Sequence, residues 1–313
     1  MDSYIRSLHH VTATVAGAQD DLDFYVGLLG QRLVKKTVNF DNPGVYHFYY
    51  GDEQGTPGTI MTTFPYAGMG IRDGIRGAGQ VTVTSFSAPV GAMAYWRRRF
   101  TDFAVPYVDD ATPFGEDAIS FADPSGLLLR LIGSEGDARA PWTGAGVPEE
   151  KAIRGIHGVS LLVREPVTTV ALVTELLDGT VIGEAAGTTR VGISGSAPGQ
   201  LLDIVQAADA PHGVNGVGTV HHVAFAAADS AQQLAVQAEL RWRGVHVTDV
   251  LDRNYFESIY FREPNGVLFE VATMPPGFAV DESVAQLGRA LKLPDWAEPN
   301  RAEIESRLPS VTY

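Results

Sequence analysis

The feature of this sequence that most constrains its fold is an internal repetition. The segment from Leu8 to Ala13 (LHHVTA) resembles the segment from Val220 to Phe225 (VHHVAF). Residues 156–160 form a weaker copy, and residues 80–85 form a degenerate one. Repetition of this kind indicates similar supersecondary units that bury their apolar faces against each other. The chain is therefore expected to consist of four related units.

Each unit also ends in a recognisable way. Residues 261–271 (FREPNGVLFEV) align without a gap with residues 121–131 (FADPSGLLLRL), and both have the pattern of strand, Pro/Gly turn and strand. Between the first strand and this hairpin lies a stretch predicted to be helical, which ends at a glycine in the first and fourth units. The four predicted helices cover residues 18–30, 90–100, 167–177 and 230–244. The order of elements in each unit is thus β-α-β-β-β.

This order predicts an α+β fold of four βαβββ modules that form two curved-sheet cups. A curved sheet from one unit has an open edge and an unfilled concave face, and pairing two units closes a cup around a pocket. The predicted modules are residues 1–70 and 75–135 within a first domain of 1–140, and residues 153–208 and 216–273 within a second domain of 153–275. Residues 133–153, rich in Gly, Pro, Asp and Glu, form the predicted linker.

The last part of the chain changes character after two consecutive prolines. Residues 276–313 are predicted to form a C-terminal extension with short helices at 284–291 and 301–308. We expect this extension to pack over a cup or over a partner subunit, so a homo-oligomer is one expected state.

Composition limits the chemistry. The 313 residues include no cysteine, so any transition metal must be held by histidines and carboxylates. The formal net charge of −14 disfavours nucleic acid as a partner, because phosphates need a positive surface. The sequence has no run of about 18 apolar residues, so no membrane helix is predicted. The first residues also lack the pattern of a signal peptide. We expect a cytoplasmic protein without a membrane partner.

Alternation along the strands selects which histidine of each pair could bind a metal. Successive side chains of a strand face opposite sides of its sheet. In residues 8–15 the odd positions are apolar, whereas the even positions, which include His10, are polar and suit the inside of a cup. In residues 220–227, His222 shares its face with two alanines, which leave room for a cavity. His10 and His222 are therefore the predicted inward-facing members of their pairs.

A carboxylate completes the predicted metal site. Glu270 lies in the middle of the otherwise apolar stretch 267–272, on the inward face by the same alternation. An unpaired carboxylate buried there would cost several kcal/mol, so a cation or a buried arginine must face it. Two imidazoles and one carboxylate suit non-haem Fe(II) and leave open positions for other ligands. We predict a metal site formed by His10, His222 and Glu270.

Only the first and last units supply all three ligands. Arg130 stands in place of Glu270 in the second unit, and Gly158 stands in place of His222 in the third. We therefore predict that the first and fourth units share the metal-binding cup and that the second and third units form a metal-free one. The alternative is that the third and fourth units pair and His157 becomes a ligand. His47, His212 and His246 lack support from the repeat and are interpreted as ordinary polar residues.

Beyond this pattern, long stretches of the chain resemble a known family. They are LHHVT at 8–12, GQRLVKKTVNFD at 30–41, YHFYYGDEQGTPGTIMTTFP at 46–65, HHVAFA at 221–226 and RNYFESIYFREPNGVLFEVAT at 253–273. The sequence resembles the vicinal oxygen chelate superfamily, which includes glyoxalases, bleomycin-resistance proteins and extradiol dioxygenases. Within that superfamily it is similar to the ring-cleaving dioxygenases of the hydroquinone type. The segment 39–46, which faces the substrate in such enzymes, departs from the chlorohydroquinone-degrading pattern, so the ring substituents stay open.

The resemblance implies an Fe(II) cofactor on His10, His222 and Glu270, with Mn(II) as the alternative ion. It further implies catalytic roles for Arg253, Tyr260 and His221, and substrate-binding roles for His9 and Thr12. The alternation of side chains along the strands also points Tyr260 into the cup. It turns His9 and His221 away from the metal, unless a bulge re-aims them.

The function expected from this resemblance is cleavage of a hydroquinone-like dihydroxylated aromatic ring with O2, in the extradiol manner. The partners would be a small aromatic substrate and O2. Three alternatives remain at this point: a glyoxalase-like metal-dependent lyase or isomerase, a catechol extradiol dioxygenase, and a non-catalytic protein that binds a small molecule.

Overall fold

The computed structural model of the chain describes residues 4–313 and contains four modules with the predicted order of elements. The first module contains β1 (Ile5–Val15), α1 (Ala18–Leu22), η1 (Asp23–Leu28), β2 (Arg32–Asn39), β3 (Asn42–Gly51) and β4 (Ile60–Pro65). The second contains β5 (Gln80–Pro89), η2 (Val90–Ala92), α2 (Met93–Asp102), β6 (Tyr107–Ala111), β7 (Asp117–Ala122) and β8 (Leu128–Ser134). The third contains β9 (Gly155–Val163), α3 (Pro166–Leu176), β10 (Gly179–Ala185), β11 (Thr188–Ile193) and β12 (Leu201–Gln206). The fourth contains β13 (Thr219–Ala227), α4 (Ser230–Trp242), β14 (Leu251–Asp252), β15 (Phe256–Arg262) and β16 (Leu268–Pro276).

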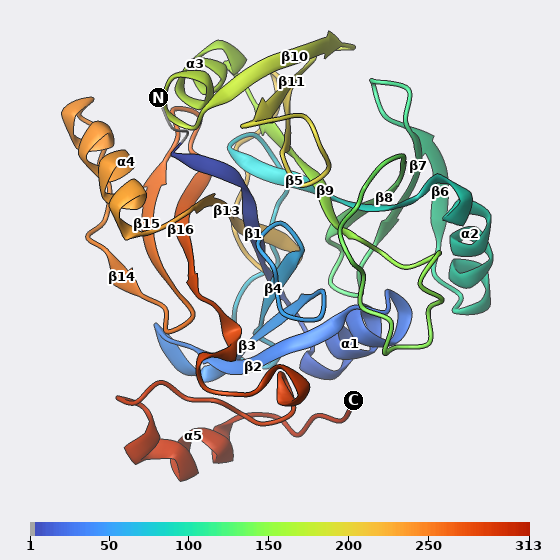
Figure 1. Cartoon of the computed structure of the whole chain (residues 1–313), viewed down its shortest axis with the longest axis vertical. Helices are drawn as coiled ribbons and strands as arrows, with labels where there is room; N and C mark the ends of the chain where they lie inside the picture. The colour runs from blue at the N-terminus through green and yellow to red at the C-terminus, as the bar shows by residue number, and fades with distance from the viewer. Residues whose placement is uncertain (1–3) are drawn as a thin grey trace.

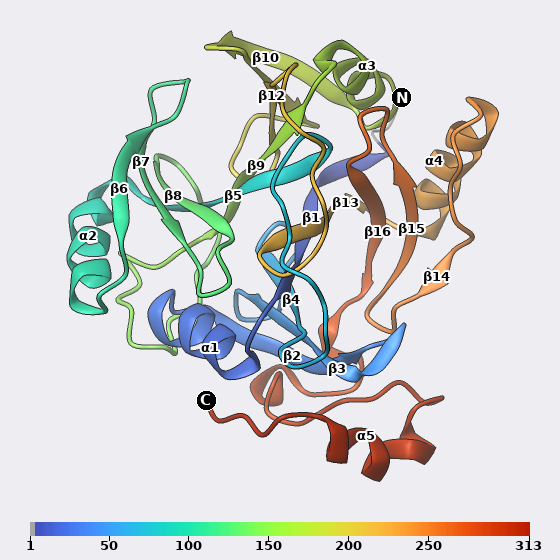
Figure 2. The same cartoon turned by 180° about the vertical axis from the view of Figure 1, so that it is seen from behind.

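The strands form two eight-stranded sheets (Figures 1 and 2). The first sheet has the order β14-β15-β16-β13-β1-β4-β3-β2, and the second has the order β10-β11-β12-β9-β5-β8-β7-β6. The modules meet through the antiparallel pairs β1–β13 and β5–β9. The first and fourth modules therefore share one sheet, so the predicted non-sequential pairing is confirmed and the alternative pairing of the third and fourth modules is wrong.

Alternation places the two faces of β1 as the sequence predicts. Val11, Ala13 and Val15 are fully buried in the main hydrophobic core, which also includes side chains from the helices. His10 and Thr14, on the other face, line a cavity inside the first sheet. The division of polar and apolar side chains along one strand thus places His10 on the cup side, as predicted for a metal ligand.

The first helix follows its predicted apolar stripe but changes geometry midway. Leu22, Tyr25 and Leu29 are buried, and the α-helical turn of α1 continues as the π-helical turn η1. Gly30 follows with a φ of 70°, a conformation that glycine adopts without strain.

The C-terminal extension lies along β2 and β3, at the bottom of Figure 1. Its elements are η3 (Phe278–Val280), η4 (Val284–Gln286), η5 (Glu298–Asn300) and α5 (Arg301–Arg307). The fully buried Lys35 of β2 holds it, with Nζ at 2.6 Å from both Asp281 Oδ1 and Glu282 Oε2. The extension thus packs against the first sheet on its cup side, where the ring of Phe278 lies 5.0 Å from that of Tyr49.

Of the two helices predicted in this extension, only the second is confirmed. Residues 284–291 form only the short 3₁₀ turn of η4. The chain turns at Gly288, whose φ is 80° and which packs so closely on β2 that a Cβ atom would lie 1.9 Å from the carbonyl oxygen of Leu33. A continuous helix cannot make this approach.

Across residues 4–313, no helix combines the length and the apolar character needed to cross a membrane.

A buried carboxyl in the first module makes stability depend on pH. Asp21 is 3% exposed, and its Oδ2 accepts hydrogen bonds from Tyr50 Oη (2.6 Å) and Thr63 Oγ1 (2.5 Å), while Oδ1 has no partner. Burial raises the pKa of Asp21 to about 7, and the two hydrogen bonds offset this only in part. Because the folded-state pKa lies above the unfolded value of 3.8, the stability contribution is complete below the unfolded pKa and is lost as the pH rises through 7.

We therefore expect Asp21→Asn to flatten the fall in unfolding free energy between the unfolded pKa of 3.8 and the folded pKa of about 7. Asparagine keeps an acceptor for Tyr50 and Thr63 but cannot ionise, and each pKa unit corresponds to about 1.4 kcal/mol. Urea unfolding at several pH values measures the slope. Asp20→Asn, at the exposed neighbouring position, is the control and should leave the slope nearly unchanged. An equal slope in wild type and Asp21→Asn would contradict the assignment.

Candidate active site

Three side chains from opposite ends of the sequence converge inside the first cup. His10 lies on β1, His222 on β13 and Glu270 on β16, three strands that are adjacent in the sheet. His222 Nε2 lies 2.8 Å from Glu270 Oε2, His10 Nε2 lies 3.4 Å from the same oxygen, and the two Nε2 atoms are 3.2 Å apart. Among the described residues, these three form the one group of His, Cys, Asp and Glu whose ligand atoms could share an ion.

The triangle fits a divalent cation. Ligand atoms held at about 2.0–2.2 Å from one ion and at right angles to each other lie about 3 Å apart. The three observed separations, 2.8, 3.2 and 3.4 Å, are close to this value. Glu270 is fully buried and its Oε2 has no hydrogen-bond donor, so a cation would satisfy an otherwise orphaned acceptor.

The electrostatics of the cluster favour a charged carboxylate. Burial opposes ionisation of Glu270, but His10 and His222 outweigh it and hold the pKa of Glu270 well below its usual range. The other oxygen, Oε1, accepts a short hydrogen bond from Ser258 Oγ, which fixes the carboxylate plane. Burial lowers the pKa of His222, which favours the neutral imidazole that a metal ion requires.

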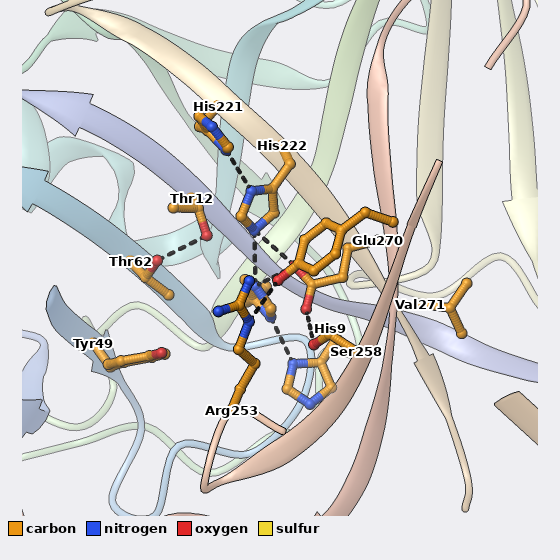
Figure 3. Close-up of polar contacts among 12 residues, drawn as sticks. His9, Thr12, Tyr49, Thr62, His221, His222, Arg253, Ser258, Glu270 and Val271 are labelled. Atoms are coloured by element: carbon orange, nitrogen blue, oxygen red, sulfur yellow. Dashed lines mark hydrogen bonds and ion pairs between the residues drawn. The ribbon is translucent and has the colours of Figure 1, made fainter. Parts of the chain in front are cut away.

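The second histidine of each pair supports the first. His9 Nδ1 lies 2.9 Å from His10 Nδ1, and His221 Nδ1 lies 2.8 Å from His222 Nδ1. Figure 3 shows His221 and His9 at opposite ends of the cluster. Burial lowers the pKa of His9 and of His221 to about 3, so both rings are neutral acceptors. Each can accept a hydrogen bond from the Nδ1–H of its neighbour and thereby leave the neighbour's Nε2 lone pair for a cation.

These contacts correct the view from simple alternation, which turns His9 and His221 away from the metal. The β1–β13 register shifts between Leu8 and His10, at the position of His9. A bulge re-aims a side chain within a strand, and here it brings the His9 ring beside His10. His221 keeps its place at the start of β13 and lines the cavity.

Two further residues from the fourth module border the cluster. Arg253 Nε donates to Tyr260 Oη at 3.3 Å, and the guanidinium lies 5.4 Å from the centre of the Tyr260 ring. Arg253 Nη2 also lies 3.4 Å from Asp41 Oδ2, across the mouth of the cup. Burial raises the pKa of Tyr260 above its usual range, so the phenol remains protonated. The Tyr260 and His222 rings are 5.6 Å apart, within reach of one small ligand.

A cavity of about 350 Å³ opens above His10 and His222. This volume is in the range of small-molecule sites. The apolar part of its wall comes from aromatic and aliphatic side chains, and the polar part comes from residues of the first and fourth modules. The lining residues are His10, Thr14, Asn39, Phe40, Asp41, His47, Tyr49, Phe64, Tyr66, His221, His222, Arg253, Phe256, Tyr260 and Leu268.

Two residues expected to bind substrate do not line this cavity. Thr12 is fully buried, and its Oγ1 accepts a hydrogen bond from Thr62 Oγ1 at 2.8 Å. His9 instead lines a separate surface pocket of about 220 Å³ behind Phe256. Their geometry fits support of neighbouring groups rather than direct contact with a substrate.

Sequence reasoning missed His47 and Tyr49. His47 was interpreted as an ordinary polar residue, yet both side chains line the cavity. The signal was present in β3, where Tyr46, Phe48 and Tyr50 belong to the main hydrophobic core and the intervening positions face the cup. A lone histidine without a counterpart in the repeat gave no reason to apply the alternation rule there.

In the second cup, a side chain of the protein itself faces the corresponding carboxylate. Asp203 of β12 pairs in register with Ser160, as Glu270 pairs with Ala224 in the first cup. Arg190 binds both oxygens of Asp203, through Nε at 2.7 Å and Nη2 at 2.9 Å. The buried carboxylate is thus neutralised by a guanidinium of the protein itself.

A family model described as the Glyoxalase/Bleomycin resistance protein/Dioxygenase superfamily matches residues 155–271. The chain is 44% identical over 301 residues to the putative ring-cleaving dioxygenase MhqO of Bacillus subtilis (strain 168). The aligned residues cover 96% of this chain and 95% of that protein. It is 37% identical over 310 residues to a chlorohydroquinone/hydroquinone 1,2-dioxygenase of Sphingobium indicum, covering 96% and 95% of the two chains. The crystal structure of a putative dioxygenase from Bacillus subtilis has a TM-score of 0.94 and 43% identity, covering 99% of this chain and 98% of that one.

The chain belongs to the glyoxalase/bleomycin resistance protein/dioxygenase superfamily, as its two cups and its matched residues show. Within that superfamily, the relatives that match nearly its whole length carry the names of ring-cleaving dioxygenases or a hydroquinone dioxygenase. The family expected from the sequence motifs is therefore confirmed.

Proposed function

We propose that this protein is an Fe(II)-dependent ring-cleaving dioxygenase that opens a hydroquinone-like dihydroxylated aromatic ring with O2, in the extradiol manner. The observation that carries the proposal is the convergence of His10 Nε2, His222 Nε2 and Glu270 Oε2 at the edge of a cavity sized for a small aromatic molecule. The reaction class is that of the relatives that match nearly the whole chain, a putative ring-cleaving dioxygenase and a chlorohydroquinone/hydroquinone 1,2-dioxygenase.

The proposed ligands for the iron are His10, His222 and Glu270, a set that occupies one face of the ion and leaves other positions open. When bound, the ion would supply a Lewis acid for a substrate hydroxyl and a redox centre for O2. His9 and His221 hold the two imidazoles in the required tautomer through the Nδ1 contacts. Mn(II) suits the same ligands as the alternative ion.

Arg253 and Tyr260 are the proposed catalytic neighbours of the ligands. Burial disfavours the charged guanidinium, but Tyr260 and Asp41 outweigh it and raise the pKa of Arg253, so its positive charge persists. A fixed cation beside the cavity stabilises negative charge that develops on oxygen during the reaction. Tyr260, which keeps its proton, can orient a substrate oxygen. His221, which also lines the cavity, can act as an acid or base toward the substrate.

One alternative is disfavoured by the register of the first module. A glyoxalase-like lyase or isomerase needs a further carboxylate on the metal, from the strand of the first module that corresponds to β16. That strand is β4, where Thr62 pairs with Thr12 as Glu270 pairs with Ala224. Threonine cannot replace the missing carboxylate. A purely binding protein would not need three converging ligand atoms, and a catechol dioxygenase differs only in substrate.

The test is O2 uptake by protein loaded anaerobically with Fe(II). Hydroquinone, methylhydroquinone, chlorohydroquinone and catechol are added in turn, and an oxygen electrode is combined with mass analysis after reaction in ¹⁸O2. We expect equimolar loss of O2 and of a hydroquinone, with both oxygen atoms in an opened product. Iron that stays bound with no uptake across the panel would remove the dioxygenase proposal, and uptake with catechol alone would favour the catechol alternative.

A further inference from the structure

The wall of the cavity formed by the first module contains a polar chain that the proposed metal chemistry does not use. Tyr49 Oη lies 2.9 Å from His47 Nδ1, and His47 Nε2 lies 2.9 Å from Thr62 Oγ1. Thr62 Oγ1 in turn donates to Thr12 Oγ1 at 2.8 Å. The chain thus runs from the cavity surface at Tyr49 to the fully buried Thr12.

The directions of these hydrogen bonds follow from one another. Because Thr62 gives its only proton to Thr12, it must accept from His47, whose proton is therefore on Nε2. His47 Nδ1 then carries a lone pair and accepts the proton of Tyr49 Oη. The phenol oxygen of Tyr49 keeps its own lone pairs free, so Tyr49 can only accept a hydrogen bond from a ligand in the cavity.

Ring contacts hold the Tyr49 side chain in this orientation. The Tyr49 ring contacts Tyr255, Phe256 and Phe278, with ring centres 6.2, 6.4 and 5.0 Å away. Figure 3 shows the Tyr49 hydroxyl pointing toward the cluster that contains Glu270 and Arg253. Burial raises the pKa of Tyr49 well above its usual range, so the hydroxyl keeps its proton.

The hydrogen-bonded series from Tyr49 to Thr12 lies where the substituent opposite the ligated oxygen of the proposed substrate would be. The metal ligands lie on β1, β13 and β16, and Tyr260 lies on β15, whereas His47 and Tyr49 lie on β3, beyond β4 on the other side of β1. β3 contributes His47 and Tyr49 to the same cavity that His10 and His222 line, so a ring bound through one hydroxyl at the ligands can extend across the cup toward β3. The substituent opposite the ligated oxygen then meets this wall, while Phe64, whose ring centre is 4.3 Å from that of His47, borders the same space.

We infer that Tyr49, held by His47, binds the second hydroxyl of a para-dihydroxylated ring and thereby selects hydroquinones over phenols and over hydroquinone ethers. This inference rests on the proposed function and names the substrate class of the same site. A para hydroxyl can donate to the fixed acceptor, whereas an ether or a carboxylate at that position has no proton to give. A catechol, whose second hydroxyl is beside the first, does not reach this wall.

The inference is tested by binding rather than turnover. Titration calorimetry of the Fe(II)-loaded protein without O2 compares hydroquinone, phenol and 4-methoxyphenol. We expect hydroquinone to bind about tenfold more tightly than either monophenol, the size of one well-placed hydrogen bond to a buried partner. Tyr49→Phe should reduce this preference to within about twofold, while binding of phenol itself changes little. His47→Leu should have the same effect, and His47→Gln, which keeps a donor and an acceptor, should restore most of the preference.

A matched control is available on the same strand. Tyr46→Phe removes a phenol hydroxyl that faces away from the cup and donates to Pro309 O, so the preference should be unchanged. An unchanged preference in both Tyr49→Phe and His47→Leu, with the wild type still preferring hydroquinone, would overturn the inference alone. Failure of the wild type to bind any phenol in the iron-loaded state would instead count against the proposed function.

Discussion

Replacing Glu270 with glutamine is expected to abolish iron retention while leaving the fold intact. The amide has no negative charge, and it places either a neutral oxygen or an NH2 group against the His10 and His222 Nε2 atoms, which lie 3.4 and 2.8 Å from the present carboxylate oxygen. Changes to groups that merely support a ligand weaken metal binding about 10- to 100-fold. Loss of the single charged ligand should therefore exceed about 100-fold.

Anaerobic titration with Fe(II), and iron content after gel filtration, measure this loss. The matched control is Asp203→Asn, which changes the corresponding acid of the second cup and should leave iron binding as in the wild type. Thermal unfolding of the iron-free proteins shows whether the fold survives. Full iron retention in Glu270→Gln would mean that the ligand assignment is wrong.

The convergence of His10, His222 and Glu270 was predictable because it depends on local rules. Alternation along β1, β13 and β16 decides which side of the sheet each residue faces. The repeat shows that only the first and fourth modules together supply all three predicted ligands. Non-sequential pairing also followed from this argument, since no sequential pairing of modules brings His10 and Glu270 into one cup. The residues nearest the ligands could therefore be named from the sequence.

The remaining features depend on tertiary contacts that no local pattern reports. The bulge at His9 arises from the register between β1 and β13. His47 becomes a cavity residue only because β3 lies beside β4, where Thr62 meets it. The apolar spacing of residues 284–291 suggested a helix, but close packing of Gly288 on β2 determined the backbone there. In each case the deciding partner lies far away in the sequence.

The second cup illustrates the same limit. The sequence indicated that it binds no metal, because Arg130 replaces the acid of the second module, but it did not reveal how Asp203 is neutralised. In the structure Arg190 binds Asp203 through two hydrogen bonds and Glu116 Oε1 at 2.9 Å, and its guanidinium lies 4.1 Å from the centre of the Phe114 ring. A protein cation thus takes the role that a bound ion is proposed to take in the first cup.

This arrangement leads to the second large expected effect. We expect Arg190→Met to lower the free energy of unfolding by about 3–5 kcal/mol, because it leaves a buried carboxylate without its partner. Glu116 loses less, since His157 Nε2 at 3.1 Å and Thr112 Oγ1 at 2.6 Å still contact it. Urea unfolding at neutral pH measures the change. Iron affinity should be unaffected, because the substitution lies in the cup without the metal ligands.

Two further variants separate charge burial from simple loss of an arginine. Arg97 also binds two carboxylates, Asp109 and Asp117, but at the surface, so Arg97→Met should cost no more than about 1 kcal/mol. In the double variant Arg190→Met with Asp203→Leu, the unpaired charge is gone, and at least half of the lost stability should return. If the double variant were as unstable as Arg190→Met alone, packing of the guanidinium on Phe114, and not neutralisation of Asp203, would be what stabilises the second cup.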